Sequence, residues 1–143
     1  MKSDSIATRH SFWDVVRPMS ALHEPLPFAR TFTREEHNVI ARGLVPAGMD
    51  DRWFIFLENN QLYFHRSWTG TCIYQITLDC TDSDSVVVTE ALVNRDPDEY
   101  KTADDEFDVA LLSFLIDTLL LGRPAHLPAR RHPADKNWGA GKK

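Results

Sequence analysis

The chain has 143 residues, of which 43% are hydrophobic and 26% charged, a composition typical of one globular domain with its own core. This excludes disordered, collagen-like and disulfide-dense proteins. The net charge is −5, yet six bases and a single acid follow Gly122. Because the rest of the chain is acidic, we do not expect its core to bind nucleic acid. The basic tail is the part that could contact RNA or an acidic partner. The alternative is a tail that is simply exposed to solvent.

We expect a cytoplasmic protein with no membrane partner. The longest apolar run, residues 109–121, contains Asp117 and is shorter than the roughly 20 residues of a membrane span. The N-terminus lacks the apolar stretch of a signal peptide. In that compartment Cys72 and Cys80 should remain thiols rather than form a disulfide.

Residues 1–32 are expected to form an irregular N-terminal arm, because three prolines interrupt regular structure after residue 17. An apolar group at 12–16 is compatible with one or two helical turns. The following part, 22–32, should lie extended along the domain. The arm is therefore expected to cover the domain rather than to contribute regular elements.

A short helix and four strands should follow the arm. Thr33 and Glu36 form the pattern of a capping box, which predicts a helix over about 34–42. Gly43 suits the end of that helix. Aromatic and β-branched runs then predict a four-stranded antiparallel meander over residues 52–58, 61–67, 71–79 and 86–94.

A long C-terminal helix is predicted over 104–121, with acids at its start, where the helix dipole favours them. Gly122 and Pro124 should end it. The predicted fold class is thus α+β, with the long helix packed on one face of the meander. The single domain spans 33–121, and 122–143 form a basic tail that contains proline and glycine.

The turns set the expected register of the strands. A two-residue turn at Asn59-Asn60 would pair Trp53 with Arg66 and Phe54 with His65. A second two-residue turn at Thr69-Gly70 would place His65 opposite Tyr74 and Arg66 opposite Ile73. Alternation then gives two faces that are both largely apolar, so both faces need a cover.

The predicted long helix is apolar nearly all round its axis, which is typical of a helix buried on every side. One chain of this length has little material to cover that helix and both faces of the sheet. We therefore expect a homo-oligomer, a dimer above all, or a stable protein partner.

The most distinctive chemistry lies in the block between residues 52 and 70, around Trp53, His65, Arg66 and Trp68. Arg66 over Trp53 would form a cation–π pair, and Arg66 with Trp68 could hold a phosphate or carboxylate beside a stacked ring. His65 beside Tyr74 could serve as an acid–base pair. The structural alternative is a buried arginine that pins the turn and a histidine packed between aromatic rings.

The block from Asp51 to Gly70, which contains the runs Asp-Arg-Trp-Phe-Ile-Phe and Leu-Tyr-Phe-His-Arg-Ser-Trp-Thr-Gly, resembles a segment of small bacterial proteins, some of which are associated with ADP-ribose-processing enzymes. That resemblance is confined to the block and assigns a role to no single residue. Two functional hypotheses stand side by side. The first is a non-enzymatic interaction module, such as an immunity, antitoxin-like or accessory protein. The second is a binder or hydrolase of a nucleotide-like or ADP-ribose-like ligand at Trp53, His65, Arg66 and Trp68.

Known catalytic and metal-binding patterns do not appear in the sequence. The histidines and cysteines lack zinc-ligand spacing, and the acidic loops lack the oxygen pattern of a calcium loop. Glycines are too few and too spread for a phosphate-binding loop or a dinucleotide fingerprint. We therefore nominate no catalytic residue, no metal site and no cofactor, and favour a protein that is not an enzyme.

Overall fold

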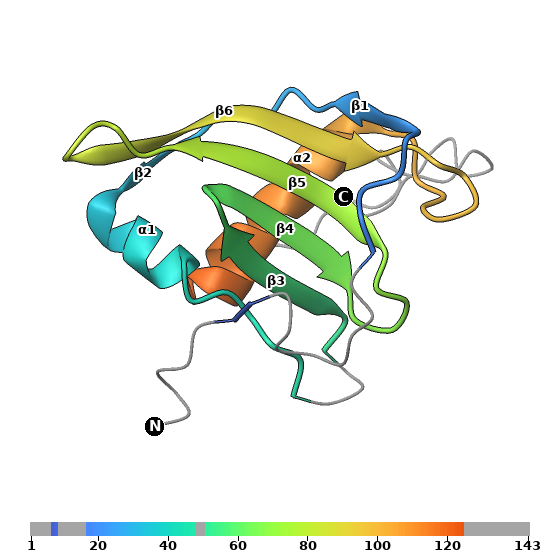
Figure 1. Cartoon of the computed structure of the whole chain (residues 1–143), viewed down its shortest axis with the longest axis horizontal. Coiled ribbons are helices and arrows are strands. Elements are labelled where there is room, and N and C mark those ends of the chain that lie inside the picture. Colours follow the sequence, from blue (N-terminus) through green and yellow to red (C-terminus); the bar gives the residue numbers. More distant parts are fainter. Residues whose placement is uncertain (1–6, 9–16, 48–50, 125–143) are drawn as a thin grey trace, which may run out of the picture.

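The computed structural model describes residues 7–8, 17–47 and 51–124. They form an antiparallel sheet of six strands, in the order β1-β6-β5-β4-β3 with β2 also paired to β6, and α2 crosses one face of it (Figure 1). The strands are β1 His23–Pro25, β2 Thr31–Thr33, β3 Trp53–Glu58, β4 Gln61–Arg66, β5 Cys72–Asp79 and β6 Ser85–Asn94. The α+β class is confirmed, whereas the sheet is larger than the predicted meander.

The two additional strands, β1 and β2, come from the segment predicted to be an irregular arm. β1 pairs with the C-terminal end of β6, and β2 pairs with its N-terminal end. Between them, the Leu26 amide donates to the Ala91 carbonyl and the Val88 amide donates to the Arg30 carbonyl, both within 2.9 Å. Strands of three residues are too short to leave a periodic pattern in the sequence, and a proline at an edge position interrupts no ladder.

Helix α1, Arg34–Ile40, begins at the predicted capping box. The Glu36 amide donates to Thr33 Oγ1 at 3.0 Å, and the Thr33 amide donates to Glu36 Oε1 at 2.9 Å. The helix ends at Ile40, two residues earlier than predicted. Gly43 follows with a φ of +68°, and a Cβ there would lie 2.3 Å from the Ile55 carbonyl oxygen, so both backbone conformation and space require glycine.

The hairpin of β3 and β4 has the predicted register. Asn59 and Asn60 adopt φ values of 54° and 63°, the positive values that a tight two-residue hairpin turn requires at both positions. The structure confirms the predicted partners, including the pairs Trp53–Arg66, Phe54–His65, Ile55–Phe64, Phe56–Tyr63 and Leu57–Leu62.

The connection from β4 to β5 is longer than the predicted two-residue turn at Thr69-Gly70. The Arg66 amide donates to the Thr71 carbonyl at 2.8 Å, so four residues, 67–70, lie between the paired ends of the strands. The prediction that Arg66 faces Ile73 is therefore wrong. We call residues 67–71 the β4–β5 connection.

An irregularity in the ladder changes which side chains of β5 share a face. The register shifts between Phe64 and His65, so that Phe64 faces Tyr74 and His65 faces Cys72. The prediction that His65 faces Tyr74 is wrong. Because a one-residue slip exchanges the faces of a strand, Tyr74 lies with Phe64 on the helix-covered face, and His65 lies on the opposite face.

The long helical segment covers the main core. It consists of α2, Asp105–Phe114, followed by a wider π-helical stretch, η2, Leu115–Leu120, where the prediction was one helix over 104–121. Asp104 caps its start by accepting from the Phe107 amide at 3.2 Å. The helix and sheet enclose a core of aliphatic and aromatic side chains that includes Ile40, Ile55, Phe64, Ile76, Val93, Leu112 and Ile116.

Burial of the helical segment is one-sided within this chain, in contrast to the predicted burial on every side. Ala110 and Leu119 are exposed, and Val109 and Phe114 are partly exposed. A dimer that would cover this side stays a prediction. Within the described residues, no helix has both the length and the apolar character needed to cross a bilayer.

The face of the sheet opposite α2 carries a smaller aromatic cluster. Phe54 and Phe56 are fully buried there, with Tyr63 and Ala7 packed against them. The Ala7 amide donates to the Arg42 carbonyl at 2.8 Å, which ties part of the N-terminal arm to the domain. The predicted helical turns at 12–16 and nearly all of the basic tail lie outside the described residues.

Candidate functional site

The structure divides the four nominated residues between different environments. Trp53 and Arg66 lie on the helix-covered face of β3 and β4. Trp68 belongs to the β4–β5 connection, with 65% of its surface exposed. His65 lies on the opposite face, only 1% exposed. Arg66 and Trp68 line one pocket together, and Trp53 supports Arg66 within it.

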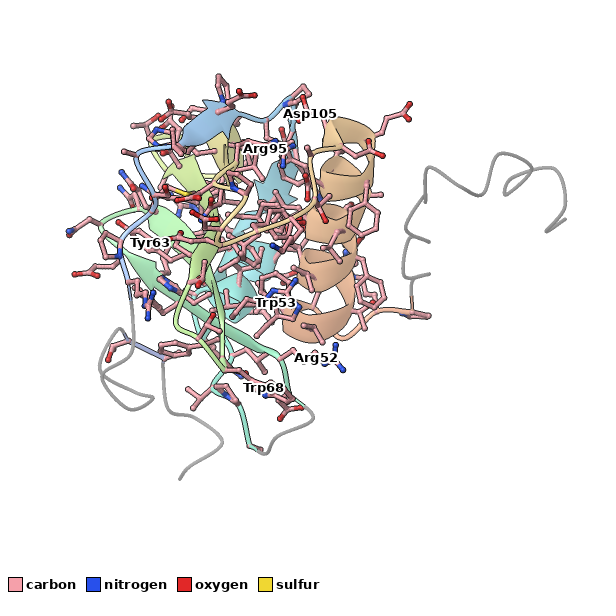
Figure 2. The ribbon with its side chains drawn as sticks, turned by 90° about the vertical axis from the view of Figure 1, so that its right-hand side faces the viewer. Arg52, Trp53, Tyr63, Trp68, Arg95 and Asp105 are labelled. Carbon is pink, nitrogen blue, oxygen red and sulfur yellow. The ribbon has the colours of Figure 1, made fainter. Side chains whose placement is uncertain are left out.

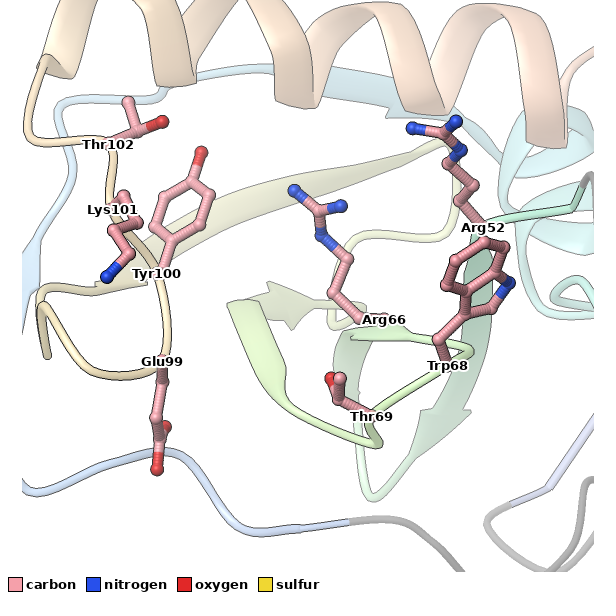
Figure 3. A pocket seen from close by; sticks show the side chains of 8 residues that line it. All are labelled: Arg52, Arg66, Trp68, Thr69, Glu99, Tyr100, Lys101 and Thr102. Atoms are coloured by element: carbon pink, nitrogen blue, oxygen red, sulfur yellow. The ribbon is translucent and has the colours of Figure 1, made fainter.

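This pocket, which we call the Arg66 pocket, has a volume of about 410 Å³. It opens between the start of β3, the β4–β5 connection and the loop that follows β6 (Figure 3). Arg66 lies near its middle, with Tyr100 on one side and Trp68 on the other. The lining residues are Arg52, Arg66, Trp68, Thr69, Glu99, Tyr100, Lys101 and Thr102.

Arg66 is held by stacked aromatic rings. Its guanidinium carbon lies 4.9 Å from the centre of the Trp53 ring, which confirms the predicted cation–π pair. Trp53 in turn stacks on Tyr74, with ring centres 6.1 Å apart and planes inclined by 13°. A second arginine, Arg52, lies 6.0 Å from the Trp68 ring. Each arginine of the pocket thus has a tryptophan beside it.

The lining of the pocket carries more positive than negative charge. Arg52, Arg66 and Lys101 are cationic, and Glu99 is the acid among the lining residues. The Glu99 carboxylate accepts a hydrogen bond from Asn94 Nδ2 at 2.9 Å and points away from Arg66 in Figure 3. Such a lining attracts an anion.

Tyr100 connects the pocket to a buried polar cluster under α2. Asp108, which is completely buried, accepts from the Tyr100 hydroxyl at 2.5 Å and from the Tyr74 hydroxyl at 2.6 Å, both at Oδ1. Its other oxygen lies 2.8 Å from Arg95 Nη1. A buried carboxylate is tolerated when it is paired and hydrogen-bonded in this way.

Arg95 also holds Asp105, at 2.5 Å from Nη2. Figure 2 shows Arg95 and Asp105 together at the start of α2, with Arg52 and Trp68 toward the other end. Burial raises the pKa of Tyr74, and burial together with the bond to Asp108 raises the pKa of Tyr100 to about 12. Both hydroxyls are therefore protonated donors at neutral pH.

His65 supports the β4–β5 connection from the opposite face of the sheet. Its Nδ1 lies 2.9 Å from the Gly70 carbonyl oxygen, and because a carbonyl only accepts, Nδ1 carries a proton. The imidazole stacks on Phe56, with ring centres 5.5 Å apart. Since Tyr74 is on the other face, the two cannot form the acid–base pair considered from the sequence.

Several pocket residues were not among those nominated from the sequence. Arg52 stands just before β3, and Tyr100, Lys101 and Thr102 belong to a segment whose sequence indicates only a charged turn. The aromatic Tyr100 among charged residues is the one feature that could have drawn attention to it. Only the pairing of distant segments brings these residues to Arg66.

Comparison with known proteins adds no assignment: no family model matches the chain, and neither a curated protein nor a solved structure matches it. The resemblance noted for the aromatic block thus rests on those residues alone. Among the described residues, no group of three or more histidine, cysteine or acidic side chains could hold a metal ion.

Proposed function

We propose that this chain binds a small organic anion with a planar ring, such as a nucleotide-like ligand, in the Arg66 pocket. One observation carries the proposal. The pocket holds a guanidinium stacked on Trp53 and a second arginine beside the exposed ring of Trp68.

Each part of that arrangement suits one part of such a ligand. A stacked guanidinium is already oriented, and its planar edge matches the oxygens of a phosphate or carboxylate. Arg52 and Lys101 add positive charge. Trp68 is 65% exposed, and a tryptophan face at the rim of a cationic pocket offers a stacking surface for a base. The volume of about 410 Å³ is in the usual range for small-molecule sites.

The proposal is limited to binding. The lining residues include no histidine or cysteine, and their one carboxylate belongs to Glu99, which already accepts from Asn94. Hydrolysis of a phosphate or glycosidic bond would call for a positioned base or nucleophile. We therefore propose ligand binding without a chemical step.

The test is a thermal-shift series with ADP, ADP-ribose, adenosine and inorganic phosphate at millimolar concentration. A ligand that binds only the native state raises the melting temperature. We expect ADP and ADP-ribose to raise it more than adenosine, and Arg66→Gln to abolish the rise. Arg123→Gln, at a half-exposed arginine paired with Glu36, is the matched control. No shift with any of the four compounds would refute the proposal.

A second candidate function rests on a different observation. Some apolar side chains of the helical segment keep part of their surface exposed, among them Val109, Phe114 and Leu119. They support the proposal of a non-enzymatic interaction module that pairs with a second copy. Native mass spectrometry of the purified chain should then show a dimer, and Leu119→Lys, at an exposed position of the segment, should convert it to a monomer. A monomer of the unaltered chain would contradict this proposal.

A further inference from the structure

The loop that forms one side of the Arg66 pocket is fastened to the start of α2. This loop, residues 95–104, contributes Glu99, Tyr100, Lys101 and Thr102 to the lining. Arg95 Nη1 donates to the Thr102 carbonyl at 3.2 Å and also lies 2.8 Å from Asp108 Oδ2. The loop therefore shares its anchor, Asp108, with the helix and the core.

Two tyrosines bind that anchor in nearly the same way. The hydroxyls of Tyr74 and Tyr100 both donate to Asp108 Oδ1, at 2.6 and 2.5 Å, and lie 3.3 Å from each other. Both side chains are buried, with Tyr74 fully enclosed between Trp53 and Phe64 and Tyr100 4% exposed. They differ in that only Tyr100 lines the pocket. The chain thus contains two equivalent hydrogen bonds, one from Tyr100, which lines the pocket, and one from Tyr74, which lies behind Trp53 and does not line it.

We infer that Asp108 is a positioning residue that binds the Tyr100 hydroxyl and so fixes the Tyr100 ring as an apolar wall of the Arg66 pocket. With the hydroxyl directed at Asp108, Tyr100 offers its ring to a ligand, and polar contacts come from the arginines and threonines. The ligand is then oriented with its anion toward Arg66 and its ring against one of the aromatic walls that Tyr100 and Trp68 form on either side of that arginine. This inference rests on the proposed function.

The experiment compares Tyr100→Phe with Tyr74→Phe in the full chain, using ADP and inorganic phosphate as probes. Each change removes one hydrogen bond to the same carboxylate oxygen, so the two variants should lose similar amounts of thermal stability. Calorimetric titration should show ADP affinity reduced about five-fold in Tyr100→Phe, the effect of one lost hydrogen bond. Tyr74→Phe keeps the ring that stacks on Trp53, so it should weaken ADP binding less than Tyr100→Phe does.

Phosphate separates a positioned ring from a generally loosened loop. It has no ring, so its affinity should be the same in Tyr100→Phe as in the unaltered chain. Asp108→Asn, which keeps an acceptor oxygen but loses the charge, should also weaken ADP binding more than phosphate binding. Asn has nearly the shape of Asp, but its amide group places an N–H donor against either Arg95 or the two tyrosine hydroxyls, so this variant should also lose thermal stability.

Each remaining outcome has a distinct meaning. If the unaltered chain binds neither ADP nor phosphate, the proposed function fails, and this inference fails with it. If the unaltered chain binds ADP and both phenylalanine variants weaken it equally, binding depends on general stability and the inference alone is overturned. Equal loss of ADP and phosphate affinity in Tyr100→Phe would also overturn the inference, because the Tyr100 ring would then make no separate contribution to binding the ring of ADP.

Discussion

The two ends of β4 differ in what determines their geometry. At one end, Asn59 and Asn60 form a tight turn whose positive φ values are a property of those two residues. At the other end, the β4–β5 connection is held from a distance. The Gly70 carbonyl accepts from the Arg17 amide at 3.0 Å and lies 2.9 Å from His65 Nδ1.

This difference matters because the second end builds the pocket. The tight turn leaves only Asn59 and Asn60 outside the ladder, whereas the β4–β5 connection places Trp68 and Thr69 in the lining of the Arg66 pocket. Residues outside a ladder can face a ligand, and a rigid scaffold positions them. Here the scaffold includes Ser67, whose hydroxyl donates to the Asp51 carbonyl at 2.7 Å.

The largest expected effect comes from removing the support of the second end. His65→Ala deletes a buried ring between aromatic side chains and its bond to Gly70. Loss of a buried ring leaves a cavity, so we expect the free energy of unfolding to fall by roughly 3 kcal/mol. Urea denaturation followed by tryptophan fluorescence measures it.

His65→Phe is the matched control for that change. It keeps the ring stacked on Phe56 but loses the bond to Gly70, so about 1–2 kcal/mol of stability should be lost. If His65→Phe is as stable as the unaltered chain, the bond from His65 to Gly70 does not support the β4–β5 connection.

A smaller effect is expected at the tight turn. Asn60→Val forces a β-branched residue to a φ of 63°, which should lower the free energy of unfolding by about 1–2 kcal/mol. Asn60→Gly should stay within a few tenths of the unaltered chain, because glycine adopts positive φ readily. A stable Asn60→Val variant would show that the turn can change type without cost.

The smallest effect concerns local opening of the structure at the two ends of β5. One cysteine lies at each end, and its reactivity reports the opening of that end. Cys72 faces His65 and is buried, and burial raises its pKa to about 12. Cys80 is partly exposed, with its sulfur 3.7 Å from His37 Nε2. Since the thiolate is the reactive form, iodoacetamide at a mildly alkaline pH should label Cys80 first.

Comparing variants makes this labelling a test of the two ends. In His65→Ala, Cys72 should be labelled several-fold faster, because its partner across the ladder is gone. In Asn60→Val, at the far end of β4, Cys72 should remain protected, whereas Cys80 loses the contact of its thiol with Asn60 Oδ1, 3.8 Å away, and should be labelled at least as fast as before. Peptide mass spectrometry distinguishes the two sites. Faster labelling of Cys72 in both variants would mean that the ends open together.

The same contrast explains which parts of the fold could be predicted. The capping box of Thr33 and Glu36 and the turn at Asn59-Asn60 depend on neighbours in the sequence, so their geometry follows from residue type. The β4–β5 connection depends on Arg17 and Asp51, which lie far away in the chain. The alternation of polar and apolar residues along a strand does not reveal the register shift in β4, because the hydrogen bonds that accompany it come from distant parts of the chain.

The candidate site was predictable to a similar extent. Arg66 over Trp53 followed from strand register, because those residues face each other in a hairpin with a tight turn. The position of Tyr100 at the same pocket depends on its hydrogen bond to Asp108. That bond joins two segments that both come after the last strand in the chain. Nothing in the charged run around Tyr100 marks it as part of an aromatic wall, since its neighbours in sequence are not its neighbours in space.

The edges of the sheet limit how another protein could attach. Along β6, short strands occupy both ends, and Leu26 and Arg30 bond to the backbone between them. Along β3, the amide and carbonyl of Ile55 are paired with Leu44. Within the described residues, neither edge therefore offers a long run of backbone for strand addition. Fibril-like stacking of copies is disfavoured for the same reason, and a partner would have to recognise side chains.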